Sequence, residues 1–354
     1  MNGAEPIKKP FIKKLLGWYN SNHITYPWRQ NIDPYCVWTS EIMLQQTQAN
    51  TAIPYFNNWI KKMPDINSVT TKSLEYILKQ WEGLGYYARA RNFYHACQKV
   101  QDKFNGNVPN KYEDLISLPG IGPYIASAIL SIAHNVPIAA IDVNAIRVYS
   151  RIFKIDFSLN KNRSNLTKLA NRIISVKKPG NFNQAIMDLG RFICRPNKPL
   201  CQKCPIKQFC KAGISGSIAS YPLKIQPKIK PKFHVAVGVV QKGNQILITK
   251  RRASGFLGGL WEFPGGKIIK KESCAECIIR EIDEEIGIKV KPVKFIAQIK
   301  HQYSHFSITL DAYYCKHISG KPSPIECDDI KWINKKDLHK FPFPKANHKL
   351  FNFL

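Results

Sequence analysis

The sequence predicts two domains of different class, an all-α domain followed by an α/β or α+β domain. Three observations support this prediction: the length of 354 residues, a change from helical to strand periodicity, and a segment rich in proline and serine between the two patterns. A chain of this length is typical of two domains of about 100–200 residues each. Hydrophobic residues make up 44% of the chain, so disorder is excluded as its main state.

Apolar residues recur at helical spacing in the first part of the chain. Residues 10–20 are expected to form a helix whose apolar stripe begins at Phe11 and ends at Tyr19. The same kind of spacing predicts helices over residues 40–51 and 74–81. The first domain is therefore predicted to be helical throughout.

Strand patterns replace helical patterns in the last third of the chain. Residues 215–232 mix Ser and Gly with three prolines and lack apolar periodicity, which is typical of a linker. A helix is expected over residues 274–285. Runs that alternate or are rich in β-branched residues predict strands around it, over residues 235–240, 245–249 and 307–314. The predicted domains are residues 1–214 and 233–354.

The net charge of +29 suggests a polyanionic partner, either a nucleic acid or an acidic membrane. Residues 233–354 carry 20 Lys and Arg against 12 Asp and Glu, which leaves +21 for residues 1–232. A solvated lysine-rich surface would be the simpler explanation of the charge. No apolar run approaches the ~18 residues of a spanning helix, and the first ten residues lack a signal-peptide core. We therefore expect a monomer without membrane contact, located in the cytoplasm or on the nucleoid.

Four of the ten cysteines lie within seventeen residues, in the pattern C-x6-C-x2-C-x5-C. Four thiolates at such spacing can enclose one metal ion or cluster, and a four-cysteine zinc site is the alternative to an iron-sulfur cluster. Cys274 and Cys277 form a further C-x2-C pair, which we interpret as packing within a helix. His234 has no partner that the sequence identifies and is interpreted as structural. The four clustered cysteines are Cys194, Cys201, Cys204 and Cys210.

Residues 112–133 read as two helical stretches around the turn Leu118-Pro119-Gly120-Ile121-Gly122. Glycines at positions 120 and 122 permit a tight hairpin whose backbone N–H groups can face a phosphate. Beside a basic chain and a cysteine loop, this pattern indicates a DNA-binding hairpin rather than a simple connection.

Two acidic residues, Glu41 and Asp142, stand in apolar surroundings. A capping or surface carboxylate is the ordinary interpretation of an isolated acid. An unpaired charge in apolar surroundings is costly, however, and this favours a functional site in which the pKa of each acid is tuned.

Five segments together resemble the MutY family of DNA glycosylases, within the endonuclease III superfamily. They are residues 38–48 (WTSEIMLQQTQ), 26–29 (YPWR), 81–89 (WEGLGYYAR), 118–124 (LPGIGPY) and the cysteine loop. The resemblance implies a helix-hairpin-helix domain whose loop 194–210 holds a [4Fe-4S] cluster. It also implies excision of adenine opposite 8-oxoguanine or guanine in double-stranded DNA.

The resemblance also assigns roles to individual residues. Glu41 is the general acid and base, Asp142 stabilises the oxocarbenium ion, and Asn144 supports the two acids. Tyr124 lies at the sugar, where lyase members of the superfamily have lysine, so a monofunctional glycosylase is expected. Val143 stands where the family commonly has glycine. The adenine pocket is assigned to Trp28, Arg29 and Gln184, and DNA contacts to Gln46, Tyr86, Gly120, Gly122, Ser304 and His305.

The residue types suit this chemistry. Adenine leaves a sugar easily only when one of its ring nitrogens is protonated, so one carboxyl must carry a proton near neutral pH. A second carboxylate is needed beside the cationic sugar. The base must also leave the helix stack before a side chain can reach it.

The second domain contains a complete Nudix box, from Gly266 through Glu272 and Arg280 to Ile288. The helix within the box places three glutamates on one face, where oxygen ligands suit Mg2+. Three interpretations stay open: glutamates paired with Arg280 and lysines, bound Mg2+ without turnover, and hydrolysis of oxidised nucleoside triphosphates. By resemblance this domain recognises 8-oxoguanine, and a damage-binding module without catalysis is a further alternative. The three glutamates are Glu281, Glu284 and Glu285.

Overall fold

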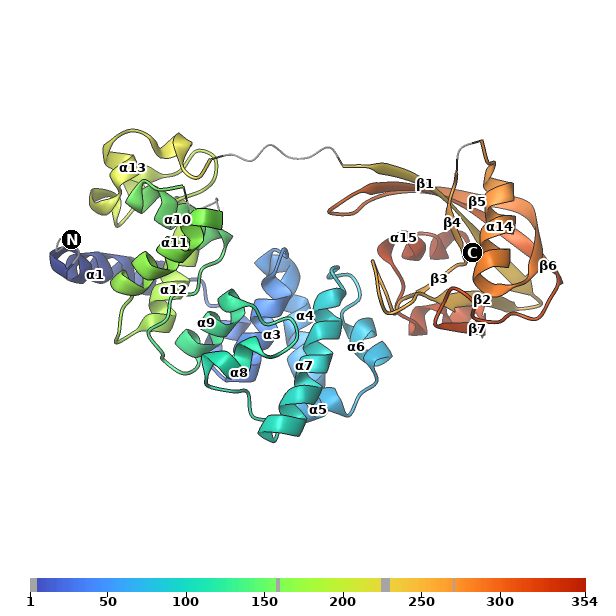
Figure 1. The fold of residues 1–354 in the computed structure, drawn as a ribbon, viewed down its shortest axis with the longest axis horizontal. Coiled ribbons are helices and arrows are strands. Elements are labelled where there is room, and N and C mark those ends of the chain that lie inside the picture. Colours follow the sequence, from blue (N-terminus) through green and yellow to red (C-terminus); the bar gives the residue numbers. More distant parts are fainter. Residues whose placement is uncertain (1–4, 157–159, 224–229, 270) are drawn as a thin grey trace. The chain divides into compact units, whose positions relative to one another are not determined.

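The computed structural model describes residues 5–156, 160–223, 230–269 and 271–354. Two compact units can be distinguished, and each is described by itself. The first comprises residues 1–71 and 92–226, and the second comprises residues 72–91 and 227–354. Figure 1 colours the elements along the chain.

The first unit is helical, as the sequence predicts. Its core joins the buried side chains of Phe11, Tyr149 and Phe182, which come from three different helices. Its longer helices are α1 (Glu5–Asn22), α3 (Pro34–Leu44), α4 (Ala49–Lys62), α7 (Ala88–Phe104), α9 (Pro123–Ile132), α10 (Val143–Phe153), α11 (Asn160–Ile173) and α12 (Pro179–Asp188), with part of α7 in the second unit. Its short helices and turns are α2 (Pro27–Gln30), α5 (Ile66–Thr70), α8 (Tyr112–Ile116), η1 (Leu189–Ile193), η2 (Cys201–Lys203), η3 (Lys207–Phe209), α13 (Lys211–Ile214) and η4 (Ile218–Ser220).

The second unit is built on a mixed sheet with the strand order β3-β2-β1-β6-β5, while β4 pairs with β1 and β7 with β2. Strands β1 and β6 are parallel, and the other pairs are antiparallel. The strands are β1 (Lys232–Lys242), β2 (Gln245–Lys250), β3 (Trp261–Glu262), β4 (Gly265–Lys267), β5 (Lys289–Gln302), β6 (Ser307–Ser319) and β7 (Asp329–Asn334). The helices are α6 (Leu74–Gln80), α14 (Cys274–Ile286), η5 (Lys335–Lys340), α15 (Lys345–His348) and η6 (Phe351–Phe353).

The helix α14 covers one face of this sheet. Its buried residues Ile278 and Ile282 pack against alternate residues of β1, which belong to one hydrophobic cluster. Gly238 of β1 allows this close approach, because a Cβ atom there would lie 2.7 Å from Ile282 Cδ1. The opposite face packs against C-terminal residues that include Phe343 and Leu350.

Segment 72–91 precedes most of the first unit's helices in sequence but groups with the second unit. The backbone N–H of Phe343 donates to Glu82 Oε1 at 2.8 Å, and the indole N–H of Trp261 donates to Glu75 Oε2 at 3.1 Å. These carboxylates therefore hold the segment against the C-terminal part of the chain.

The predicted elements agree with the structure except at residues 40–51. The helix α3 ends at Leu44 and α4 begins at Ala49, with Gln46 between them at a φ of 55°. Helical apolar spacing on both sides of this turn concealed the break. The predicted strands and the helix over 274–285 are confirmed. Of the predicted linker, residues 224–229 lie outside the described residues. No helix within the described ranges has the length and apolar character needed to cross a membrane.

Candidate active site

Glu41 lies on α3, a helix in which the nine residues from Tyr35 to Met43 are all buried. Asp33 begins this helix by accepting hydrogen bonds from the backbone N–H groups of Tyr35 and Cys36, and Pro34 occupies the first helical position. The side chain of Glu41 thereby reaches an interior position, and the residue is only 7% exposed. A carboxyl placed there has lost most of the contact with water that would stabilise its charge.

The protonation of Glu41 is set by its surroundings. Burial raises the pKa of Glu41 to about 7; the Tyr124 hydroxyl and Arg29 favour its ionised form, while the neighbouring charge of Asp142 opposes it. The Tyr124 hydroxyl donates a hydrogen bond to Glu41 Oε2. Tyr124 is the second residue of α9, so the hairpin before that helix positions it. At neutral pH, Glu41 can therefore both give and take a proton.

Asp142 is the N-cap of α10 and accepts from the backbone N–H of Ala145 at 2.6 Å. Its second oxygen accepts from the side-chain amide of Asn144 at 2.8 Å. Burial raises the pKa of Asp142, and these two donors together with Arg147 oppose that shift. The capping interpretation of this acid is thus correct, but the carboxylate also faces Glu41 closely enough to raise its pKa.

A chain of hydrogen bonds runs from Asp142 to the cysteine loop. Arg147 donates from Nη2 to Asn144 Oδ1 at 2.9 Å and to Gly190 O at 2.7 Å, and from Nε to Cys194 O at 2.8 Å. Gly190 lies in η1, a π-helical turn, where a Cβ atom would lie 2.8 Å from Asn144 Cβ. The orientation of Asn144, and through it that of Asp142, depends on the cysteine loop.

The residues assigned to the adenine pocket are held by polar and aromatic partners. Arg29 donates to both carboxylate oxygens of Asp188, at 2.7 and 2.8 Å. Trp28 is buried and stacks on Tyr26 with ring centroids 5.0 Å apart. Gln184 accepts from the hydroxyl of Tyr19 at 3.2 Å. A fixed cation and a flat indole at the same end of the unit can orient a planar base.

The hairpin between α8 and α9 has the predicted glycine turn. Gly120 has a φ of 79°, and a Cβ atom there would lie 2.8 Å from Asn92 Cβ, so glycine is required by the fold itself. Gly122 caps α9 with an ordinary φ of −96°, and a Cβ atom there would meet open space. The helix that follows has its free N–H groups at this glycine, where a phosphate can be bound.

Two residues assigned to DNA contacts have a left-handed backbone conformation, which is uncommon for residues other than glycine. Gln46 has a φ of 55° and is exposed, and Tyr86 has a φ of 50°. Such conformations cost free energy and concentrate at functional sites. Within the second unit, the Tyr86 hydroxyl forms a hydrogen bond with Ser304 Oγ. Ser304 and His305 are exposed at the tip of the hairpin between β5 and β6.

The four clustered cysteines lie around the short turns η2 and η3. No three of their sulfur atoms lie within 4.8 Å of one another in the described part of the chain. Four cysteine thiols are the donor set of both a [4Fe-4S] cluster and a four-cysteine zinc site. Arg151 is only 3% exposed. It donates to Cys194 Sγ at 3.3 Å and to the Arg195 carbonyl at 2.8 Å. Polar N–H groups thus already point at the sulfurs.

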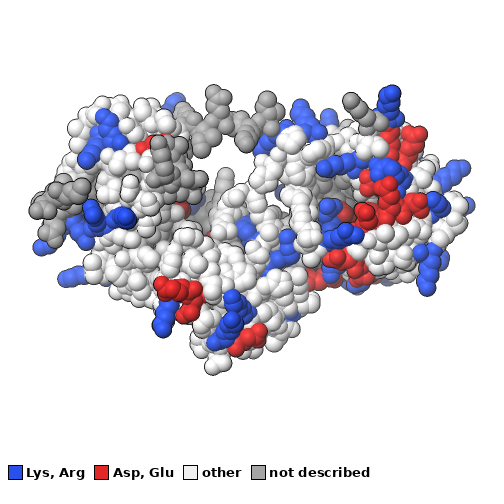
Figure 2. Space-filling view, in the orientation of Figure 1, with Lys and Arg blue, Asp and Glu red and all other residues white. Residues whose placement is uncertain are grey.

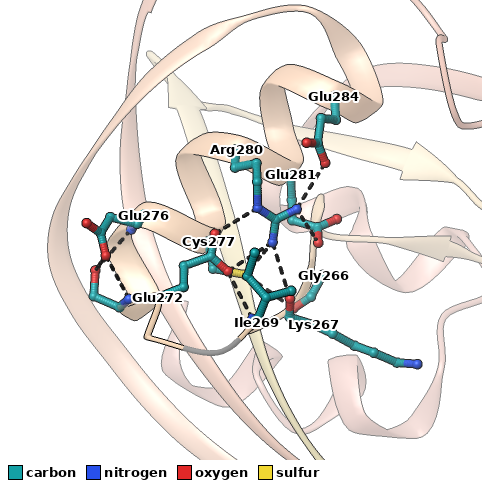
Figure 3. A network of polar contacts seen from close by, with 10 residues as sticks. Gly266, Lys267, Ile269, Glu272, Glu276, Cys277, Arg280, Glu281 and Glu284 are labelled. Carbon is teal, nitrogen blue, oxygen red and sulfur yellow. Dashed lines mark hydrogen bonds and ion pairs between the residues drawn. The ribbon is translucent and has the colours of Figure 1, made fainter.

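In the second unit, Arg280 ties three glutamates of the Nudix box together. It donates to Glu272 at 2.7 Å, to Glu281 at 2.9 Å and to Glu284 at 3.0 Å, as Figure 3 shows. The side chain of Glu281 fills the space over Gly266, where a Cβ atom would overlap it. Glu281 and Glu284 are thus paired with Arg280, as one of the three interpretations of the sequence expects.

Glu285 has a different environment. Burial and the nearby Glu262 carboxylate raise its pKa above the ordinary value, and the backbone N–H of Gly265 donates to it at 3.3 Å. Glu262 is itself bound by Arg251 through contacts of 2.6 and 2.7 Å. Figure 2 shows that acidic side chains gather on this unit among lysines and arginines.

A helix-hairpin-helix beside the buried Glu41 and the half-buried Asp142, on one chain with a Nudix fold, defines a DNA glycosylase of the base-excision class. A family model described as an HhH-GPD superfamily base excision DNA repair protein matches residues 39–175. A second model, described as a NUDIX domain, matches residues 235–352. The chain belongs to the adenine DNA glycosylase family, a hydrolase family of DNA repair.

Relatives support this assignment, and solved structures share the fold of part of the chain. An adenine DNA glycosylase of Buchnera aphidicola subsp. Baizongia pistaciae is 35% identical and covers 85% of this chain and 84% of its own length. That of Homo sapiens is 30% identical and covers 96% of this chain and 73% of its own. A thermostable thymine-DNA glycosylase structure aligns with a TM-score of 0.57 at 27% identity, over 60% of this chain and 100% of its own. An endonuclease III–DNA complex, at 22% identity, shares the fold with a TM-score of 0.52 over 61% of this chain and 99% of its own.

Sequence reasoning missed three positioning residues: Arg147, Arg151 and Asp188. The i, i+3 spacing of Asn144 and Arg147 on α10 was a signal for the first of these. The partners of Arg151 and Asp188 lie far along the chain, so no local pattern could identify them.

Proposed function

We propose that this protein excises adenine paired with 8-oxoguanine or guanine from double-stranded DNA as a monofunctional glycosylase. The observation that carries the proposal is the buried Glu41, whose pKa is about 7, beside the hydroxyl of Tyr124 and the charge of Asp142. The names of the relatives support adenine as the base removed. Tyr124 has no amine, so a Schiff base with the sugar cannot form at this position.

In this proposal Glu41 donates its proton to a ring nitrogen of the flipped adenine. The bond between adenine and the sugar then breaks, and its electron pair leaves with the base. The carboxylate of Asp142 stabilises the cationic sugar, held in place by Asn144 and the N–H of Ala145. Glu41, now ionised, takes a proton from the water that adds to the sugar.

The pocket and the hairpin account for recognition. Trp28 and Arg29 line the adenine pocket with Gln184, while Gly120 and Gly122 present N–H groups to the DNA backbone. Gln46 and Tyr86 enter the duplex around the opposing base. Ser304 and His305, exposed at their hairpin tip, contact the oxidised guanine.

Single-turnover excision assays at one stated salt concentration test this function, because phosphate contacts make binding depend on salt. Adenine should be released from duplexes with 8-oxoguanine or guanine opposite, and not from those with thymine. Equal release from all three duplexes, or strand cleavage without added base, would contradict the proposal.

Cys194, Cys201, Cys204 and Cys210 would hold a [4Fe-4S] cluster that braces the loop. Their four thiols and the N–H donors of Arg151 and Gly213, which already contact two of the sulfurs, support this assignment. Burial raises the pKa of the Cys204 thiol to about 12, and cluster binding would release this proton. Purified protein should contain about four iron atoms per chain, and Cys204→Ser should lose them.

A second candidate function is Mg2+-dependent hydrolysis of an oxidised nucleoside triphosphate. It is favoured by Glu285, whose pKa is raised by burial and by the nearby Glu262 carboxylate, because a divalent cation beside the two acids would offset their repulsion. The full chain should then release monophosphate from 8-oxo-dGTP with Mg2+, and Glu285→Gln should not. Absence of product from the wild-type protein would remove this function and leave damage recognition as the role of the domain.

A further inference from the structure

A second group of possible metal ligands lies in the second unit, apart from the Nudix glutamates. His234, Cys274 and Asp311 each offer one ligand atom, and these three atoms lie within 4.8 Å of one another. They come from three different elements: β1, the first position of α14, and β6. Within the described residues, no other group of three or more His, Cys, Asp or Glu ligand atoms has this spacing.

The sheet brings these residues together by its register. Asp311 of β6 pairs with Ala236 of β1, so His234, two residues earlier, lies on the same face of the sheet. This is the face that α14 covers, and Cys274 stands where that helix begins. The strands β1 and β6 and the first residue of α14 therefore fix the arrangement of the three side chains.

The three ligand atoms are already drawn together by hydrogen bonds. His234 Nε2 lies 2.7 Å from Asp311 Oδ2, and Cys274 Sγ lies 3.4 Å from the same oxygen. Ligand atoms around tetrahedral zinc lie about 3.3–3.8 Å apart, so movements of less than about 1 Å would admit an ion.

The surroundings suit a cation that keeps one open position. The side chain of Asp311 is 8% exposed and that of His234 is 48% exposed, so one side of the group is buried and the other faces solvent. Gln298, paired with Asp311 across β5 and β6, donates to Asp311 Oδ1 at 2.9 Å. Such a donor orients a ligating carboxylate and leaves its other oxygen for the metal.

We propose that His234, Cys274 and Asp311 bind one Zn2+ ion, with water as the fourth ligand. One imidazole nitrogen, one thiolate and one carboxylate are ligands that zinc accepts, whereas Mg2+ prefers oxygen alone. Binding displaces the thiol proton of Cys274 to solvent. The bound ion would join the start of α14, and with it the Nudix box, to β1 and β6.

Calorimetric titration of Zn2+ into the full chain tests the proposal, with the cysteine loop left unchanged in every variant. His234→Gln is the main variant, because an exposed side chain can be replaced without disturbing the core. It should weaken this binding event by about tenfold or more, as should Cys274→Ser. Two matched controls, His317→Gln and Cys327→Ser, should bind as the wild type does.

A second measurement separates a metal site from a hydrogen-bonded cluster. Zn2+ should raise the midpoint of thermal unfolding of the wild-type protein by several degrees more than that of His234→Gln, and Mg2+ should not. Identical Zn2+ titrations and identical Zn2+-induced shifts for wild type and His234→Gln would overturn the proposal. Zinc binding that persists in Glu285→Gln would show that the site is separate from the Nudix glutamates, and its loss there would contradict the assignment.

Discussion

Two groups of carboxyls, one in each unit, differ in how their charge is compensated. In the first unit, Glu41 and Asp142 are bound by neutral donors such as the Tyr124 hydroxyl and the Asn144 amide. In the second, Glu272, Glu281 and Glu284 all contact the guanidinium of Arg280.

This difference is visible in the pKa values of one acid from each group, Glu41 and Glu272. Burial without a contacting cation raises the pKa of Glu41 to about 7. By contrast, hydrogen bonds from Arg280 lower the pKa of Glu272 to about 2. A cluster of glutamates therefore indicates catalysis less reliably than one acid whose pKa burial has brought close to neutral pH.

The largest effect expected from this contrast is on catalysis. Glu41→Gln keeps the shape of the side chain but removes the proton, so single-turnover adenine release should slow by about 10²–10⁴-fold. Glu281→Gln, the matched change in the second unit, should leave the rate unchanged. Comparable losses in both variants would remove the distinction between the two groups.

The raised pKa of Glu41 should also appear in stability. The carboxyl titrates near 4.5 when unfolded and near 7 when folded, so its contribution is present below pH 4.5 and is lost as pH rises through 7. The free energy of unfolding of Glu41→Gln minus that of the wild type should therefore increase by about 3 kcal/mol from low pH to pH 8. Urea unfolding at several pH values measures this, and a pH-independent difference would contradict the shift.

A smaller effect tests how the first unit meets DNA. Gly120→Ala should lose about 1–2 kcal/mol of stability because its φ and the Cβ of Asn92 both oppose a side chain. Gly122→Ala should keep its stability but weaken DNA binding about tenfold, because a methyl group would obstruct the phosphate. Thermal unfolding and DNA titration measure the two quantities. Equal DNA affinity of wild type and Gly122→Ala would argue against phosphate binding there.

The smallest effect is expected for the ion pairs of Arg280. The Glu284 side chain is 55% exposed, so Glu284→Gln should change the free energy of unfolding by less than about 1 kcal/mol. A larger loss in chemical denaturation would mean that this pair matters more to the fold than its exposure indicates.

Local patterns predicted the fold class and most elements, since periodicity and glycine turns act within a few residues. The hairpin at Gly120 and the helix at Cys274 are examples. Contacts between distant residues could not be predicted in this way. The partner of Arg29 is Asp188, and His234, interpreted from the sequence as structural, meets Asp311 and Cys274 only through the sheet register. The expected packing of Cys274 and Cys277 on the helix is confirmed, but the polar contact of Cys274 with Asp311 could not be read from the local pattern.

The pH dependence of the single-turnover rate tests the central claim about Glu41 most directly. Because the acid must be protonated to assist departure of the base, the rate constant should fall about tenfold per pH unit above a pH of about 7. The pH dependence should vanish in Glu41→Gln. A wild-type rate that stays constant from about pH 6 to about pH 9 would contradict the account. The protonated fraction of a carboxyl with a pKa near 7 falls steeply over that range, so a constant rate could not depend on its proton.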